Sequence, residues 1–229
     1  MSDKIRPAQG LARSIGLALM AAMAIAILAP IFVGDGGLEG ASTRGAATYI
    51  AALRSVMIAD ALSAALACFV AYGFYKLLAP VNAAFAGLAA TCRIVAAGVT
   101  GFGVFLAYDA IGDINSLEGV DDFSAALQAN AAHLTELRFD LFHWSLIVSS
   151  VGAALTYLLL FVGGLVPRLL SAYGFVASIG AVVGASAIYL APSLSEAMFP
   201  AYVAANAVAY ISLFAWLIIF GVGARRNDG

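Results

Sequence analysis

The sequence predicts an all-α protein, a polytopic transmembrane bundle of six helices with a short amphipathic helix in an outer loop. Hydrophobic residues make up 63% of the 229 residues and charged residues only 10%, whereas soluble domains are about half apolar and about a quarter charged. The apolar residues fall into long runs, and a run of about 20 residues crosses a bilayer as a helix. Too few charges remain to cover a water-soluble surface. These observations favour one transmembrane domain over residues 1–229.

The first three helices are expected over residues 11–33, 49–78 and 81–108. Basic residues precede the first apolar run, as in a signal peptide, but residues 15–33 carry no charge and are long enough to span a bilayer. We therefore expect a first helix that is retained. Pro80 separates the second helix from the third, at a position where proline costs least because no helical hydrogen bond is lost.

The last three helices are expected over residues 139–164, 168–190 and 199–223. The loop before residue 139 predicts an interfacial amphipathic helix that leads into the fourth helix, because apolar side chains recur near helical spacing after two suitable N-cap residues. The apolar positions are Phe123, Leu127, Ala131, Leu134 and Leu141, and the caps are Asp121 and Asp122. This helix would either cover the outer end of the bundle or act as a gate or docking surface.

The basic residues of the loops predict the orientation in the membrane. Lysine and arginine concentrate on the cytoplasmic side of membrane proteins. One side of the predicted bundle carries Lys4, Arg6, Arg13, Lys76, Arg168, Arg225 and Arg226, and the other side is mainly acidic. We therefore expect both termini in the cytoplasm.

The second, third and fourth helices hold the candidate polar site. Its residues are Asp60, Arg93, His143, Arg54 and Asp140. Charges at bilayer depth are costly and persist when they are paired, hydrated or near the interface. Arg54 can snorkel and Asp140 can cap its helix, but Arg93 lies near mid-helix. We expect Asp60 as its first partner and His143 as its second, because a carboxylate matches a guanidinium in a bidentate pair.

This cluster has two interpretations. In the first, the ion pair is structural and fixes the register of the helices. In the second, the cluster is a site for a solute, an anion or a proton, and His143 responds to pH because its reference pKa is near neutrality. The corresponding functions are a protein that binds, transports or senses a small solute, or a structural or accessory subunit of a larger membrane complex. An intramembrane lipid enzyme is the third alternative.

The sequence carries no known catalytic, metal-binding or nucleotide-binding motif. We therefore expect no cofactor and no metal, lean against an enzyme, and expect no nucleic-acid partner because there is no basic patch. Membrane lipids are the expected partners, with a homo-oligomer or a membrane complex as alternatives. Gly180 and Gly184 form a GxxxG motif, which permits close helix packing within the bundle or between protomers.

Three features follow one another along the chain. Arg93 follows a turn bounded by Pro80, Phe142-His143 opens the fourth helix, and Pro167-Arg168 opens the fifth. In this order, and over the stretch LRFDLFHWSLIVSSVGAALTYLLLFVGGLVPRLLSAYGFVASIGAVVG, the sequence resembles a family of bacterial integral membrane proteins, domain of unknown function 4386. The resemblance covers most of the chain and implies six helices and a bacterial inner membrane. It implies no activity, because the family has none established.

Overall fold

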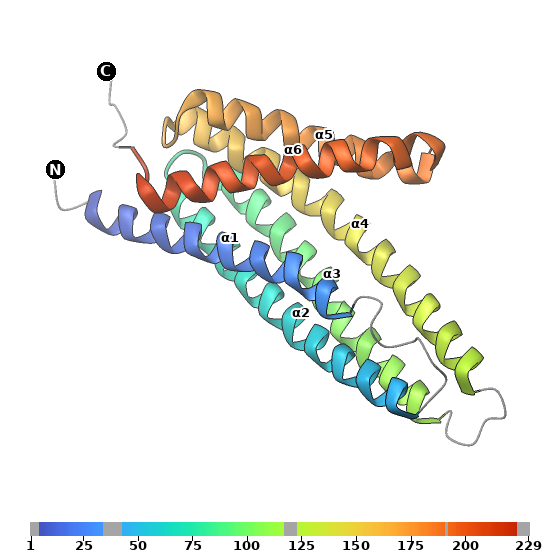
Figure 1. The fold of residues 1–229 in the computed structure, drawn as a ribbon. Helices are drawn as coiled ribbons and strands as arrows, with labels where there is room; N and C mark the ends of the chain where they lie inside the picture. The colour runs from blue at the N-terminus through green and yellow to red at the C-terminus, as the bar shows by residue number, and fades with distance from the viewer. Residues whose placement is uncertain (1–4, 34–42, 117–122, 191, 224–229) are drawn as a thin grey trace.

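The computed structural model describes residues 5–33, 43–116, 123–190 and 192–223, and these residues form six α-helices and no strand. The helices are α1 (Ile5–Val33), α2 (Thr43–Leu78), α3 (Ala83–Ser116), α4 (Phe123–Gly163), α5 (Arg168–Leu190) and α6 (Pro192–Ile219) (Figure 1). Each contains a segment that is long and apolar enough to cross a membrane. The predicted fold class, a multi-pass helical membrane bundle, is confirmed.

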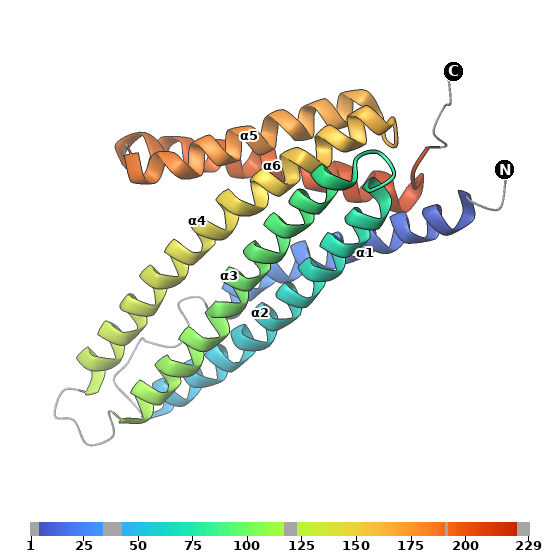
Figure 2. The ribbon, with the colours of Figure 1, turned by 180° about the vertical axis from the view of Figure 1, so that it is seen from behind.

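Helices that are neighbours in sequence are also neighbours in space. Each helix packs against the next, and α6 packs against α1, so the six helices close into a ring. The first turn of α1, the end of α6, and the α2–α3 and α4–α5 turns lie together at what we call the proximal end (Figures 1 and 2). The opposite end is the distal end. Consequently α2, α4 and α6 all run toward the proximal end.

The helices differ greatly in length. α2, α3 and α4 have 36, 34 and 41 residues, whereas α5 has 23. At about 1.5 Å per residue, α4 is about 60 Å long, about twice the hydrocarbon thickness of a bilayer. The distal parts of these three helices run together and diverge from α5 and α6 (Figures 1 and 2). The distal half is therefore a three-helix extension, and the proximal half is a six-helix bundle.

The boundary predicted at residue 139, between a short amphipathic helix and the fourth transmembrane helix, is wrong. Residues Phe123–Gly163 form one continuous helix, because no proline or glycine lies between residues 123 and 151 to end it. The predicted apolar stripe does face inward, since Leu127, Ala131 and Leu134 are buried. The two proposed capping aspartates lie outside the described residues.

Several other helix ends also differ from the expected ones. α3 continues through Asp109 and Asp113 to Ser116, so it extends well beyond the predicted end at residue 108. α6 begins at Pro192, and Pro200, expected near a helix end, lies inside it. Proline suits the first helical turn, where its missing N–H has no helical acceptor in any case, so Pro192 fits its position at the start of α6.

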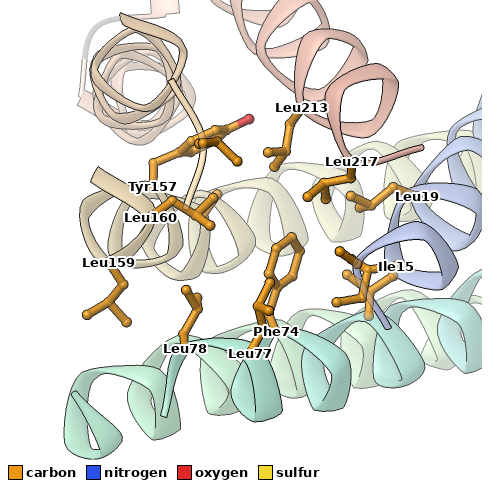
Figure 3. Close-up of a cluster of buried hydrophobic side chains, with 14 of the residues drawn as sticks. Ile15, Leu19, Phe74, Leu77, Leu78, Tyr157, Leu159, Leu160, Leu213 and Leu217 are labelled. Atoms are coloured by element: carbon orange, nitrogen blue, oxygen red, sulfur yellow. The ribbon is translucent and has the colours of Figure 1, made fainter. Parts of the chain in front are cut away.

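The main apolar core lies in the proximal half. Phe74 of α2 and Tyr157 of α4 point between the helices, close to Ile15 of α1 and to Leu213 and Leu217 of α6 (Figure 3). All five side chains are almost fully buried. The core therefore ties the first, middle and last helices of the chain together.

Two glycines allow close approach of α5 to its neighbours. Gly174 lies against the ring of Tyr157 and Gly184 lies against the ring of Tyr202, and neither position has room for a Cβ atom. The Tyr157 hydroxyl then donates to the carbonyl of Ala209 on α6 at 2.9 Å. Gly180 faces open space, so only Gly184 of the GxxxG pair serves packing within the bundle.

A second core stabilises the distal extension. It is formed by α2, α3 and α4 alone, with Leu53, Ile114 and Leu134 at its centre. Because no described residue of α5 or α6 belongs to this cluster, the core of the distal half is distinct from that of the proximal half.

Candidate functional site

An ion pair joins α2 to α4 at the boundary between the two halves. Arg138 Nη1 donates to Asp60 Oδ2 at 2.8 Å, and Nη2 donates to Oδ1 at 3.3 Å. This is the bidentate arrangement that a guanidinium and a carboxylate favour. Gly103 of α3 makes room for it, because a Cβ atom there would lie 2.9 Å from Asp60 Oδ2. The pair therefore depends on all three long helices.

A partly open cavity of about 130 Å³ lies beside this pair. Its walls are Asp60, Val99, Thr100, Gly103, Arg138, Leu141, Phe142 and Ser145. The Thr100 and Ser145 hydroxyl oxygens lie 3.2 Å apart, and Ser145 also donates to the carbonyl of Ala96 at 3.3 Å. The cavity thus offers a carboxylate, a guanidinium and two hydroxyls. An engineered cavity of about 150 Å³ holds benzene in another protein, so this volume suits a comparably small molecule.

The predicted contact between Asp60 and Arg93 is wrong. Asp60 lies level with Gly103 on α3, and Gly103 is ten residues from Arg93, or about 15 Å along the helix. An arginine side chain does not close that gap. The carboxylate pairs instead with Arg138. Arg138 immediately precedes the predicted start of the fourth helix at residue 139, but it lies well inside the continuous α4.

Arg93 lies inside the ring of helices with only 8% of its surface exposed. Its guanidinium carbon is 5.2 Å from the ring centre of Phe74 on α2 and 6.0 Å from that of Tyr210 on α6. Its aliphatic stem lies against Gly152 of α4. The buried Nε and Nη2 atoms have no hydrogen-bond partner among the described residues. The cation is thus surrounded by aromatic rings and apolar contacts.

His143 is fully buried in a separate aromatic environment. Its Nδ1 lies 2.8 Å from the carbonyl oxygen of Phe139, an acceptor, so Nδ1 carries the hydrogen. The imidazole ring is 4.2 Å from the ring of Phe139, 5.4 Å from that of Phe142 and 5.7 Å from that of Phe199. Nε2 is buried without a partner in the described part of the chain. The structure therefore separates His143 from the Asp60–Arg138 pair and gives it no contact with Arg93.

The two remaining predicted site residues lie on the surface. Arg54 and Asp140 are both exposed. Asp140 lies within α4 and therefore does not cap it. Desolvation raises the pKa of the nearby Tyr189 phenol, and the negative charge of Asp140 raises it further. The five residues predicted as one cluster thus occupy at least three distinct places.

Two buried, uncharged polar residues on α4 and α6 were not anticipated. Ser150 of α4 and Asn206 of α6 are buried, and Ser150 Oγ and Asn206 Oδ1 have no partner among the residues described. α4 and α6 run parallel, with His143 beside Phe199, so equal steps along both helices bring Ser150 level with Asn206. A search for polar side chains inside apolar helices, in place of a search for ionisable ones alone, would have found both.

The comparisons with known proteins address the family but not the activity. No curated protein and no solved structure matches the chain significantly. The sequence profile of one family, described as a domain of unknown function (DUF4386), matches residues 14–221. The match begins at Ser14 in α1 and ends at Gly221, just after α6, so it includes both the Asp60–Arg138 pair and Arg93. The chain therefore belongs to the domain of unknown function 4386 family.

Proposed function

We propose that this membrane protein binds a small polar solute in the cavity between α2, α3 and α4, and so transports or senses it. The observation that supports this most is the position of the Asp60–Arg138 pair on the wall of a partly open cavity. A pair that served only to hold two helices together would need no adjacent space. The two charges and the Thr100 and Ser145 hydroxyls provide both donors and acceptors for a polar ligand.

The position of the cavity suits a solute that arrives from the distal side. Gly103 lies twenty residues beyond Ala83 on α3, or about 30 Å, which is close to the hydrocarbon thickness of a bilayer. Trp144 and Tyr189 stack at about this level with ring centres 5.3 Å apart, and such aromatic residues are typical of a membrane–water interface. A ligand could therefore reach the cavity without crossing the bilayer.

Native mass spectrometry of the full chain, purified in mild detergent, tests this proposal. The informative variant is Gly103→Ala, because its new methyl group would displace the Asp60 carboxylate from the cavity wall. The matched control is Gly98→Ala on the same helix, where a Cβ atom meets nothing within 4 Å. We expect a co-purified small molecule on the wild-type protein and on Gly98→Ala, and little or none on Gly103→Ala.

Other outcomes would contradict the proposal. A ligand retained equally by all three proteins would place the binding site elsewhere. A stoichiometric protein partner with no small molecule would favour the alternative function, an accessory subunit of a larger membrane complex.

We further propose that the proximal end faces the cytoplasm of a bacterial cell, with the protein in the inner membrane. Lys76 and Arg168 lie at that end, whereas Asp109 and Asp113 lie on the distal part of α3, and this difference follows the positive-inside rule. Reporter fusions after Ala79, Gly119 and Gly229 test it. A periplasm-dependent reporter should be active only at Gly119, and activity at Gly229 would overturn the orientation.

A further inference from the structure

Arg93 is a permanently charged group in the middle of the bundle. It lies ten residues from Ala83, the first residue of α3, so it is about 15 Å from the proximal end of that helix, or halfway across a hydrocarbon layer of about 30 Å. A lysine or histidine can lose its proton when it is buried, but a guanidinium does not. The charge must therefore be balanced by an anion, by water or by the protein.

The described part of the protein supplies no anion for Arg93. Asp60 is engaged with Arg138 about 15 Å away along α3, and Asp140 is exposed. The rings of Phe74 and Tyr210 provide cation–π attraction, but this leaves the N–H groups without acceptors. Buried charges normally have both a partner and hydrogen bonds.

The two unpartnered nitrogen atoms define what would fit. Nε and Nη2 of Arg93 form one edge of the guanidinium, and their N–H bonds point the same way. This edge matches the two oxygens of a planar carboxylate. Ser150 lies two turns after His143 and so projects from the same face of α4, toward α6, at about the level of Gly152, which contacts the Arg93 stem. Its buried hydroxyl has no partner among the described residues. The surroundings are otherwise aromatic, so the rest of the ligand should be apolar.

We propose that Arg93 binds the carboxylate of an organic acid with an apolar body, and that Ser150 contributes a second hydrogen-bond donor. The acid could come from water or from the membrane as a fatty acid, and the chemistry at the guanidinium is the same for both. This site is independent of the solute cavity beside Asp60, so it does not rest on the function proposed above.

Thermal unfolding of the full chain in mild detergent, titrated with defined probes, tests the site. The probes are benzoate for a water-soluble acid, oleate for a membrane acid, benzamide as the uncharged counterpart of benzoate, and inorganic phosphate. We expect a saturable rise in Tm with benzoate or oleate. Benzamide should require at least a tenfold higher concentration for half-saturation, because it lacks the charge that the guanidinium recognises.

Three variants distinguish binding at Arg93 from binding elsewhere. Arg93→Met keeps the length of the side chain without the charge and should abolish the carboxylate-dependent shift. Arg93→Lys keeps the positive charge but removes the two parallel N–H donors, so the carboxylate concentration at half-saturation should rise at least tenfold. Ser150→Ala should raise it several-fold. The control is Arg54→Met, which removes an exposed arginine from α2 and should leave the shift unchanged.

The outcomes are distinct. A shift with benzoate assigns the acid to water, and a shift with oleate alone assigns it to the membrane; either supports the proposal if Arg93→Lys weakens it. A stronger shift with phosphate than with either carboxylate, equal shifts in wild type and Arg93→Lys, or no saturable shift at all would overturn it. Gly103→Ala should leave the carboxylate shift intact, so failure of the solute cavity and failure of this site are distinguishable.

Discussion

The two halves of the molecule treat an arginine inside a long helix in opposite ways. At the boundary with the distal half, Arg138 keeps 31% of its side chain exposed and still has a bidentate carboxylate partner. In the proximal half, Arg93 is only 8% exposed and has two buried nitrogen atoms without a partner among the described residues. The arginine with the greater need of a counter-ion is the one that lacks it. The more deeply buried arginine is thus the unpaired one, and for this reason we propose a ligand for Arg93.

The largest expected effect is at Arg93. In the absence of ligand, Arg93→Met should stabilise the protein by about 1–4 kcal/mol, because replacing buried charge by an apolar side chain of similar volume is often favourable. The free energy of unfolding in detergent measures this, and Arg54→Met should change it by no more than about 0.5 kcal/mol. A destabilisation by Arg93→Met of several kcal/mol would mean that the chain itself supplies a partner, and the contrast between the halves would fail.

The tight packing of the proximal half gives the next effect. Gly174→Ala would place a methyl group into the ring of Tyr157, so we expect a loss of about 1–3 kcal/mol from overpacking. Gly180→Ala on the same helix meets nothing within 4 Å and should be neutral or slightly stabilising, because alanine favours helix over glycine. Similar losses in the two variants, measured by thermal unfolding, would show that the contact with Tyr157 does not set the effect.

The distal ion pair should contribute less. Asp60→Asn and Arg138→Gln should each cost about 1 kcal/mol, and the coupling between them in a double-mutant cycle should be about 0.5–1 kcal/mol. The reason is that water still reaches both side chains, which are 13% and 31% exposed. Raising the salt concentration should reduce the coupling. Strict additivity of the two substitutions would argue against the contact.

The sequence predicted the architecture well because the long apolar runs and the prolines of the two short turns, Pro80 and Pro167, point to the same six helices. It predicted the polar site less well, and the reason is local. The predicted fourth helix begins at residue 139, so Arg138 lies outside the predicted helix and outside the predicted polar site. The apolar stripe through Leu127, Ala131 and Leu134, uninterrupted by glycine or proline, was the signal for a continuous helix.

Arg93 illustrates the other limit of sequence reasoning. Its position in the middle of α3 correctly indicated a buried side chain. Its neighbours could not be read from the sequence, because the relative heights of antiparallel helices depend on where each begins. Asp60 of α2 was predicted to lie beside Arg93 of α3, but it lies beside Gly103, ten residues further along that helix. This difference is about 15 Å, more than any side chain can span.

The unbroken α4 also has a mechanical consequence. From Phe123 to Val151 the helix contains neither proline nor glycine, so it has no ready hinge. At the first glycine, Gly152, α4 packs tightly against α3, since a Cβ atom there would lie 2.9 Å from the carbonyl oxygen of Ala89. A force applied to the distal turns would therefore tilt α4 as a stiff rod about a pivot beside Arg93.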